Sequence, residues 1–334
     1  MSRAAEAPLL VRLPNWLGDL VLAWPVVDAA ARQGAIFAGP EPFRALVEPR
    51  YPGSAYVAVS RARRFAAVAP IRRLRPRAAL LLTESLSSAL VTWLGGVPER
   101  IGYAAEGRNL LLTRPVRRVG SPRSMPRARE YIVLAEAAGL EVASGIPRIA
   151  PLEPELSAGN TCLERASAPP ATYGVVAPGA SYGPAKQWGP ERFAEACRAL
   201  GERGSGIVLV GSREDGDAAR QVIRLLGGRA PIHDLTGATD LPALIGILAR
   251  AGFVLSNDSG VMHLAAALGR PTVGIFGSTS PVWTSADAPW VRSLYAAYPC
   301  SPCFRRTCPI GYGCLRSIDA SEVTAAALEV MARG

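Results

Sequence analysis

Short apolar runs of strand length alternate with helical segments along this chain, and the alternation occurs twice. The first series opens with Leu9–Leu13, which predicts a buried strand, followed by a tight loop and a helix over 20–32. A second strand is expected over 78–82, with an apolar helix over 89–94. Alternation of this kind favours an α/β fold with a mainly parallel sheet.

The alternation starts again after a proline-rich segment. Residues 147–170 contain five prolines, a composition typical of a linker. A chain of 334 residues is long enough for two domains. We therefore predict two doubly wound, Rossmann-like domains that face each other across a cleft, over 1–165 and 166–334. The second series is expected to contain strands over 173–177, 206–210, 252–256 and 272–276, helices over 190–203, 215–226, 240–250 and 260–268, and a terminal helix.

The chain has a single lysine, Lys186, among 36 arginines. Because arginine supplies every other side-chain cation of this kind, one ammonium indicates a site that the broad guanidinium cannot serve. Lys186 follows the predicted strand 173–177 and a loop of small residues that contains the Ser181 hydroxyl. Backbone N–H groups, a hydroxyl and an ammonium together suit a diphosphate. The alternative is a surface lysine without a role.

A second polar turn, Asp258-Ser259-Gly260, follows the strand predicted over 252–256 and opens an apolar helix. A phosphate at this turn would meet the N–H groups and the positive end of that helix. Asp258 or Ser259 can equally cap the helix, and the two roles can coexist. His263 lies one turn further and could reach the same loop, although a buried histidine often has only a structural role.

A third candidate position is Asp19, which follows Gly18 in the first strand-to-helix loop. A carboxylate there would lie opposite the phosphate loop, where a general base is needed if the second domain holds the donor. Aspartate is also a common helix N-cap, so this position alone is not specific.

Three segments, in order and spacing, resemble those of glycosyltransferase family 9, the ADP-heptose:lipopolysaccharide heptosyltransferases. The Gly-Pro-Ala-Lys and Cys-Ser-Pro-Cys-Phe sequences resemble the heptosyltransferase II branch in particular. The likeness extends over nearly the whole chain. The segments are Asn15–Asp19, Pro178–Trp188 and Asn257–His263, continued by Ala266–Pro271 and Gly274–Pro281.

The resemblance implies a GT-B fold and inverting transfer of heptose from ADP-L-glycero-D-manno-heptose, with no metal and no other cofactor. The acceptor would be the lipid A-linked core oligosaccharide of lipopolysaccharide. Such an enzyme would be cytoplasmic and peripheral at the inner face of the inner membrane. We expect no signal peptide and no membrane-spanning segment, because the sequence has no apolar run of about 20 residues. Both expectations agree with that location.

The resemblance also assigns roles to residues. The family's general base corresponds to Asp19, within a loop that includes Gly18. Its diphosphate-binding hydroxyl and lysine correspond to Ser181 and Lys186. The acid that binds the nucleotide ribose corresponds to Asp215, with Glu214 as the adjacent alternative. The remaining donor-binding positions fall on Asp258, Ser259, Gly260 and His263.

The net charge of +10 is concentrated in the first half of the chain. Residues 1–165 carry 22 arginines against 14 acidic residues, whereas 166–334 carry 15 basic residues against 13. The arginines of 61–77 and 114–129 predict a polyanionic partner: nucleic acid, anionic lipid head groups or a phosphorylated or carboxylated glycan. The alternative is an ordinary solvated face. The resemblance favours the core oligosaccharide, with its phosphates and keto-sugar carboxylates, bound by the first domain, and an anionic membrane surface.

Four cysteines cluster near the C-terminus with spacings of two, four and five residues. They could ligate zinc or an iron–sulfur cluster, or remain reduced thiols, since a reducing cytosol disfavours structural disulfides. They are Cys300, Cys303, Cys308 and Cys314.

Three other functions compete with heptose transfer. A family 9 transferase could use another nucleotide sugar, because no residue in the sequence is known to contact the sugar ring. A basic nucleic-acid-binding protein is disfavoured, since no helix-turn-helix or aromatic-interleaved basic strand is recognisable, so we expect no nucleic-acid partner. A Rossmann dehydrogenase is also disfavoured, because no Gly-x-Gly-x-x-Gly follows the first strand.

Overall fold

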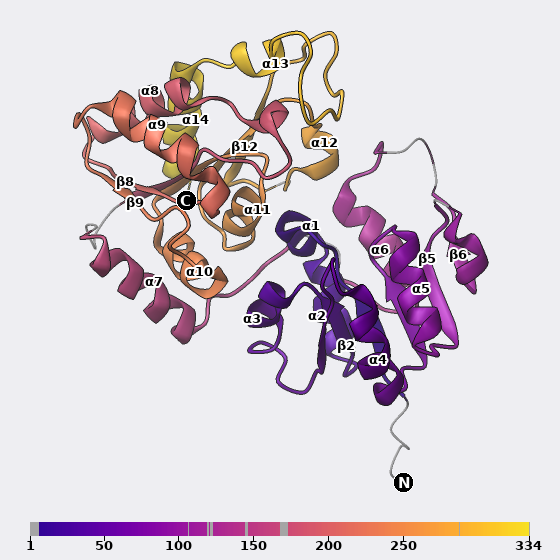
Figure 1. Cartoon of the computed structure of the whole chain (residues 1–334). Helices are drawn as coiled ribbons and strands as arrows, with labels where there is room; N and C mark the ends of the chain where they lie inside the picture. Colours follow the sequence, from indigo (N-terminus) through magenta and orange to yellow (C-terminus); the bar gives the residue numbers. More distant parts are fainter. Residues whose placement is uncertain are drawn as a thin grey trace. The chain divides into compact units, whose positions relative to one another are not determined.

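The computed structural model describes residues 7–105, 107–118, 120, 123–143, 146–167, 173–286 and 288–333. The chain divides into two compact units, residues 1–145 and 146–334. Each unit is built on one six-stranded sheet, and every strand pair in both sheets is parallel (Figure 1). The prediction of two doubly wound α/β domains is therefore confirmed.

In the first unit, the strand order reverses between β1 and β4, which are neighbours at the centre of the sheet. Both strands are fully buried because helices cover the two faces of a parallel sheet. Loops at such a reversal commonly bind ligands. The order is β3-β2-β1-β4-β5-β6, with β1 at Leu9–Arg12, β2 at Ile36–Gly39, β3 at Tyr56–Ala58, β4 at Ala78–Leu81, β5 at Glu99–Tyr103 and β6 at Arg114–Val116.

The helix expected over 20–32 is two helices, α1 (Leu17–Leu22) and α2 (Trp24–Ala31). Pro25 stands at the start of α2, and its missing N–H interrupts the helical hydrogen bonds at Ala23. The other helices of this unit are η1 (Glu41–Phe43), α3 (Arg44–Val47), η2 (Arg64–Ala67), α4 (Val68–Leu74), α5 (Leu86–Leu94), η3 (Arg108–Leu111) and α6 (Arg127–Ala137).

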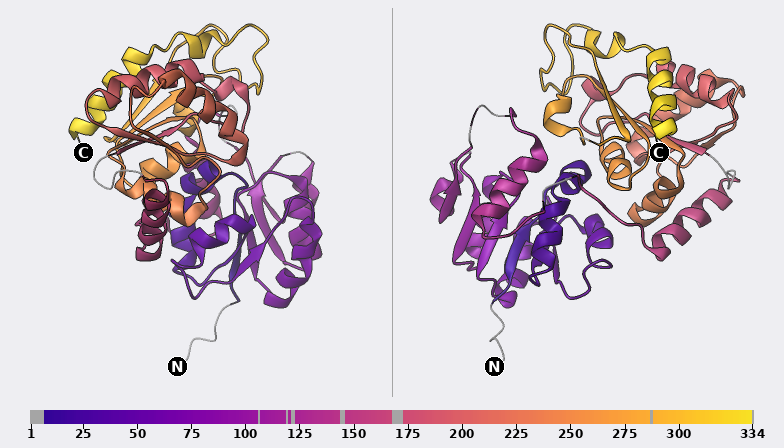
Figure 2. Two further views of the ribbon diagram at one scale, coloured as in Figure 1. Left: turned by 60° about the vertical axis from the view of Figure 1, so that its left-hand side comes forward. Right: turned by 180° about the vertical axis from the view of Figure 1, so that it is seen from behind.

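The second unit repeats the architecture, with helices on both faces of its sheet (Figure 2). Its strand order is β12-β11-β10-β7-β8-β9, with β7 at Tyr173–Ala177, β8 at Gly206–Leu209, β9 at Ile232–Asp234, β10 at Phe253–Asn257, β11 at Thr272–Phe276 and β12 at Val291–Tyr295. Its helices are α7 (Glu153–Arg165), η4 (Pro184–Lys186), α8 (Pro190–Gly201), η5 (Arg213–Asp215), α9 (Gly216–Leu226), α10 (Leu241–Arg250), α11 (Gly260–Ala267), α12 (Pro281–Thr284), α13 (Gly313–Arg316) and α14 (Ala320–Arg333). Within the described part of the chain, no helix combines the length and apolar character needed to cross a bilayer.

The boundary between the units follows residue 145 rather than residue 165, because α7 packs against α10 of the second unit. The predicted linker over 147–170 thus contains a helix. Pro154 lies in its first turn, where proline is tolerated, and the Glu155 carboxylate accepts a hydrogen bond from the Leu152 N–H at 2.8 Å.

The α7–α10 contact depends on two glycines. A Cβ atom at Gly159 would lie 2.6 Å from the carbonyl carbon of Gly246, and one at Gly246 would collide with the Glu155 carbonyl oxygen. We expect Gly246→Ala to destabilise the protein by about 1–3 kcal/mol through overpacking, even though alanine favours helices. Chemical denaturation measures this change.

The matched control is Ser157→Ala on the exposed face of α7, which should change stability by less than about 0.5 kcal/mol. If the Gly246→Ala protein unfolded at the same denaturant concentration as the wild type, the close packing of α7 on α10 would be refuted.

Candidate functional site

Three loops of the second unit meet at one edge of its sheet. They follow β7, β10 and β11, which are adjacent in the order β11-β10-β7. Because the three strands are parallel, their carboxyl ends lie side by side. The two motifs that the sequence analysis singled out in this half of the chain, at Lys186 and at Asp258, are thereby brought together.

Asp258 is the centre of this cluster. Its Oδ2 atom lies 2.6 Å from the Lys186 ammonium and accepts a hydrogen bond from the Thr279 hydroxyl, also at 2.6 Å. Its Oδ1 atom lies 3.5 Å from His263 Nε2. The Asp258 carboxylate thus contacts one residue from each of the two neighbouring loops and one from the helix that follows it.

Burial alone would raise the pKa of Asp258, but the charges of Lys186 and His263 and their hydrogen bonds hold that pKa well below its usual value. Asp258 is therefore ionised at neutral pH. The Lys186 side chain keeps 13% of its exposure, against 2% for the Asp258 side chain. The ammonium is thus the accessible member of the pair, and Asp258 positions it.

Asp258 and Ser259 do not cap α11, contrary to the alternative weighed from the sequence. Ser259 occupies the N-cap position, but its hydroxyl lies 2.8 Å from the Ser256 hydroxyl and makes no capping bond. The carboxylate of Asp258 points to Lys186 instead. The first backbone N–H groups of α11, from Gly260 onward, are left for another acceptor.

His263 is buried in α11 and reaches the loop through Asp258. Its Nδ1 atom is buried without a hydrogen-bond partner among the described residues. Ser181, by contrast, is an exposed residue of the loop after β7. Of these two predicted donor-site residues, Ser181 is thus the one that is directly accessible.

Asp215 lies against the same loop. Its carboxylate accepts hydrogen bonds from the backbone N–H and the hydroxyl of Ser212, both at 2.8 Å. It also packs so closely on Gly179 that a Cβ atom there would collide with it. The neighbouring Glu214 is exposed. Asp215 is thus the acid that touches the Lys186-bearing loop, whereas its role toward a ribose remains a prediction.

Asn257 fixes this loop and was missed by sequence reasoning. Its side-chain oxygen accepts from the Trp188 N–H at 3.0 Å, and its side-chain nitrogen donates to the Pro178 carbonyl at 2.8 Å. Asn257 is the last residue of β10, and a polar residue at the end of a buried strand was the available signal. Thr279 was also missed, because nothing local indicates its contact with Asp258.

The cysteine-rich segment, residues 300–314, forms hydrogen bonds with the loop that follows β7. The Tyr182 hydroxyl donates to the Phe304 carbonyl at 2.5 Å, and the Ala185 N–H donates to the Arg306 carbonyl at 3.0 Å. All four cysteines are free thiols. Among the residues that the structure describes, no group of three or more His, Cys, Asp or Glu is placed to hold a metal ion.

In the first unit, Asp19 lies in the first turn of α1, beside the buried Gly18. Its Oδ1 atom accepts a hydrogen bond from the Tyr131 hydroxyl at 3.1 Å and lies 3.4 Å from Arg127 Nε. Trp16, not Asp19, occupies the N-cap. The carboxylate is therefore oriented by two side chains of α6, and about a quarter of its side chain is exposed.

Arg127 is shared with two further carboxylates. It lies 2.9 Å from Glu84 and 2.6 Å from Glu130. Arg118 pairs with the same two residues, at 2.6 and 3.4 Å. Burial alone would raise the pKa of Glu84, but Arg118 and Arg127 lower it overall. With Asp19, the network contains three carboxylates and two guanidinium groups.

A cavity of about 630 Å³ opens beside the same β1–α1 loop. Its lining includes Asn15, three arginines against one glutamate, and serines at the start of α5. The charged residues are Arg12, Arg61, Arg64 and Glu41. Burial lowers the pKa of Arg12 to about 10, so Arg12 stays charged at neutral pH. The cavity therefore suits an anionic, hydroxyl-rich ligand.

The family model for glycosyltransferase family 9 (heptosyltransferase) matches residues 68–312. The chain is 33% identical over 222 residues to lipopolysaccharide heptosyltransferase 2 of Escherichia coli (strain K12). This alignment covers 64% of this chain and 63% of that relative. The aligned region thus spans less than two thirds of the relative's length.

Two solved structures match almost completely. The E. coli ADP-heptose LPS heptosyltransferase II superposes with a TM-score of 0.81 and 26% identity, over 98% of this chain and 99% of the other. A glycosyl transferase family 9 protein from Veillonella parvula gives a TM-score of 0.82 over 98% of each chain, at 18% identity, which shows the shared fold. The expected GT-B class is confirmed by these matches.

The Asp258 cluster predicts a specific dependence of stability on pH. Since the pKa of Asp258 is lower in the folded than in the unfolded chain, its contribution is complete above the unfolded value of about 3.9 and is lost as the pH falls toward the folded value. Asp258→Asn removes the ion pair, which should cost about 3–5 kcal/mol at pH 7.

Denaturant unfolding at pH 7 and near pH 3 measures this effect. The gap between wild type and Asp258→Asn should narrow at the lower pH, whereas Asp217→Asn, at an exposed carboxylate, should follow the wild type throughout. A gap that stays constant would show that Asp258 is not held ionised by its partners.

Proposed function

The chain belongs to glycosyltransferase family 9, and from this membership we propose that it transfers heptose from ADP-L-glycero-D-manno-heptose to the inner core of lipopolysaccharide, with inversion at the anomeric carbon. The relatives named heptosyltransferase 2 and II support this specificity. The observation that carries the proposal is the Lys186 ammonium, held by buried Asp258 where three loops meet.

The second unit would bind the donor. Its diphosphate would lie between the Lys186 ammonium, the Ser181 loop and the first N–H groups of α11, with Asp215 placed for the ribose. These groups would stabilise the negative charge that develops on the departing ADP. Electrostatic stabilisation of this kind is usually the largest contribution to catalysis.

The first unit would supply the base. Asp19 would take the proton of the acceptor hydroxyl while that oxygen forms the new bond to the anomeric carbon and the bond to the ADP oxygen breaks. Tyr131 and Arg127 would orient the carboxylate. Glu84 and Glu130 also pair with Arg127, so that its guanidinium is shared among three carboxylates.

The acceptor would enter the cavity lined by Arg12, Arg61 and Arg64. Guanidinium groups suit the phosphates and keto-sugar carboxylates of the core oligosaccharide. An acceptor anchored by lipid A would place the enzyme in the cytoplasm, in peripheral contact with the inner membrane. Nucleic acid has no part in this proposal.

Release of ADP tests the function. Purified protein is mixed with ADP-heptose and either heptose-free or singly heptosylated core acceptor, in the presence of EDTA. We expect ADP to be released with the singly heptosylated acceptor and not with the heptose-free acceptor. Release with a different nucleotide sugar, and none with ADP-heptose, would identify the chain as a family 9 transferase of another specificity.

Asp19→Asn should abolish transfer and leave the affinity for ADP-heptose unchanged, because the amide cannot accept the proton. Transfer rates and calorimetric binding of the donor measure the two effects separately. Asp28→Asn is a control on α2 that should retain transfer. An active Asp19→Asn enzyme would disprove the assignment of the base.

Lys186→Ala should weaken binding of ADP and slow turnover by about 100- to 1,000-fold, as loss of one charge-stabilising donor does. Binding of adenosine, which has no diphosphate, should be unchanged and shows that the site is folded. If Lys186→Ala weakened adenosine and ADP binding equally, the lysine would have a structural role only.

A further inference from the structure

Helix α5 of the first unit exposes an apolar face. Leu86 and Trp93 are 47% and 50% exposed, and Leu90 is partly exposed between them. Positions 86, 90 and 93 are spaced by four and three residues and so share one face of the helix. The inward face carries Ala89 and Val91, which join the core of the unit, together with Ser88 and Thr92, and all four are buried. The outward face is therefore also apolar, whereas an ordinary surface helix presents polar side chains to solvent.

Two neighbouring elements extend this apolar surface. Phe65 on η2 is more than half exposed, and Leu110 on η3 is 95% exposed. Both elements contact α5. Single exposed apolar residues are common, but several on adjoining elements indicate a binding surface.

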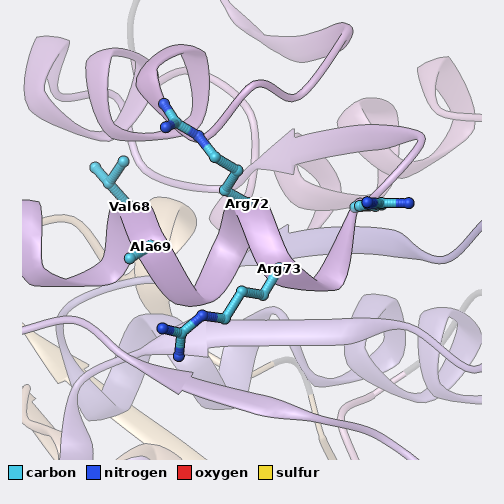
Figure 3. A pocket seen from close by; sticks show the side chains of 5 residues that line it. Val68, Ala69, Arg72 and Arg73 are labelled. Atoms are coloured by element: carbon cyan, nitrogen blue, oxygen red, sulfur yellow. The ribbon is translucent and has the colours of Figure 1, made fainter.

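Arginines adjoin the apolar side chains. Arg72 of α4 donates to the Leu94 carbonyl at the end of α5, at 2.6 Å, so the two helices are direct neighbours. Arg72 and Arg73 extend to opposite sides of α4 and, with Arg75, line a hollow on this helix (Figure 3). No acidic residue occurs between positions 49 and 83. The surface is therefore positively charged as well as apolar.

We propose that this α4–α5 face, formed by Phe65, Arg72, Arg75, Leu86, Trp93 and Leu110, docks on an anionic lipid bilayer. Arginines would contact the head groups, while the leucines and the aromatic rings enter the interface between head groups and acyl chains. The inference rests on the proposed function in one respect, since an acceptor anchored by lipid requires contact with a membrane.

The position of the cavity in the first unit agrees with this face. Ile71 of α4 and Val91 and Thr92 of α5 line the cavity that carries Arg61 and Arg64. The same two helices thus form a wall of the cavity and, with their outward side chains, the docking face. An acceptor with its lipid in the bilayer would have its sugars next to the cavity.

Charge and shape favour a bilayer over two other occupants. A second copy bound through a two-fold axis would set this basic surface against itself, with like charges opposed. A single nucleic-acid strand gains affinity from aromatic stacking, which would use Phe65 and Trp93 but leave Leu86 and Leu110 exposed.

Vesicle sedimentation tests the proposal without acceptor or donor. The wild-type chain is expected to bind vesicles of phosphatidylethanolamine and phosphatidylglycerol but not phosphatidylcholine, and added salt should weaken binding. Each neutralised arginine should lower the affinity by about fivefold, so Arg72→Glu with Arg75→Glu should lower it by at least roughly 25-fold. Leu86→Gln should also weaken binding. Tryptophan emission should shift to the blue on anionic vesicles, and Trp93→Phe should remove most of this shift among the six tryptophans.

Matched controls lie in the second unit. Arg224→Glu with Arg229→Glu makes the same change in net charge, and Leu225→Gln alters a leucine that is 44% exposed. Both controls should bind as the wild type does. If the control and test arginine pairs lost vesicle affinity equally, binding would depend only on net charge and the proposal would be overturned. Dimer formation through this face, or tighter binding to DNA than to vesicles, would also overturn it.

The outcomes separate this inference from the proposed function. A docking variant should keep wild-type ADP release with a delipidated core acceptor and lose it with acceptor embedded in vesicles. Vesicle binding without any ADP release would retain the docking face and refute the proposed reaction. ADP release with no vesicle binding would retain the reaction and refute the face.

Discussion

The buried carboxylate of Asp258 is the interaction on which the donor side of the structure depends. An ionised group in the interior is unfavourable unless it is paired and hydrogen-bonded. Asp258 meets this requirement with Lys186 from the loop after β7, His263 from α11 and Thr279 from the loop after β11. Satisfying one charge therefore fixes the relative positions of the loops after β7, β10 and β11. Lys186 is the more exposed member of the ion pair, with 13% of its side chain accessible.

Much of this arrangement follows from the sequence. Buried apolar runs predicted strands such as β1, β7 and β10, and the single lysine drew attention to the loop after β7. Short or partly exposed strands such as β3 and β9 gave no such signal. Helix α7 was interpreted as linker because proline at a helix start and proline in a loop look alike. Long-range contacts, such as Thr279 with Asp258, leave no local pattern at all.

The arginines show most clearly what composition does not resolve. Their excess in the first half predicts a polyanionic partner, yet they fall into different structural classes. Arg108 is fully buried and donates to the carbonyls of Thr83 and Tyr103, at 2.5 and 2.8 Å. Arg127 belongs to the carboxylate network of Asp19, whereas Arg73 is exposed on α4. Packing alone distinguishes a structural arginine from one available to a ligand.

A crystal structure of the chain with ADP would test the central claim most directly. The account predicts a diphosphate oxygen at about 2.7–2.9 Å from Lys186 Nζ, with the Asp258 carboxylate still paired to the same ammonium and the first N–H groups of α11 facing the phosphates. ADP bound with its diphosphate away from Lys186 and α11 would contradict the account.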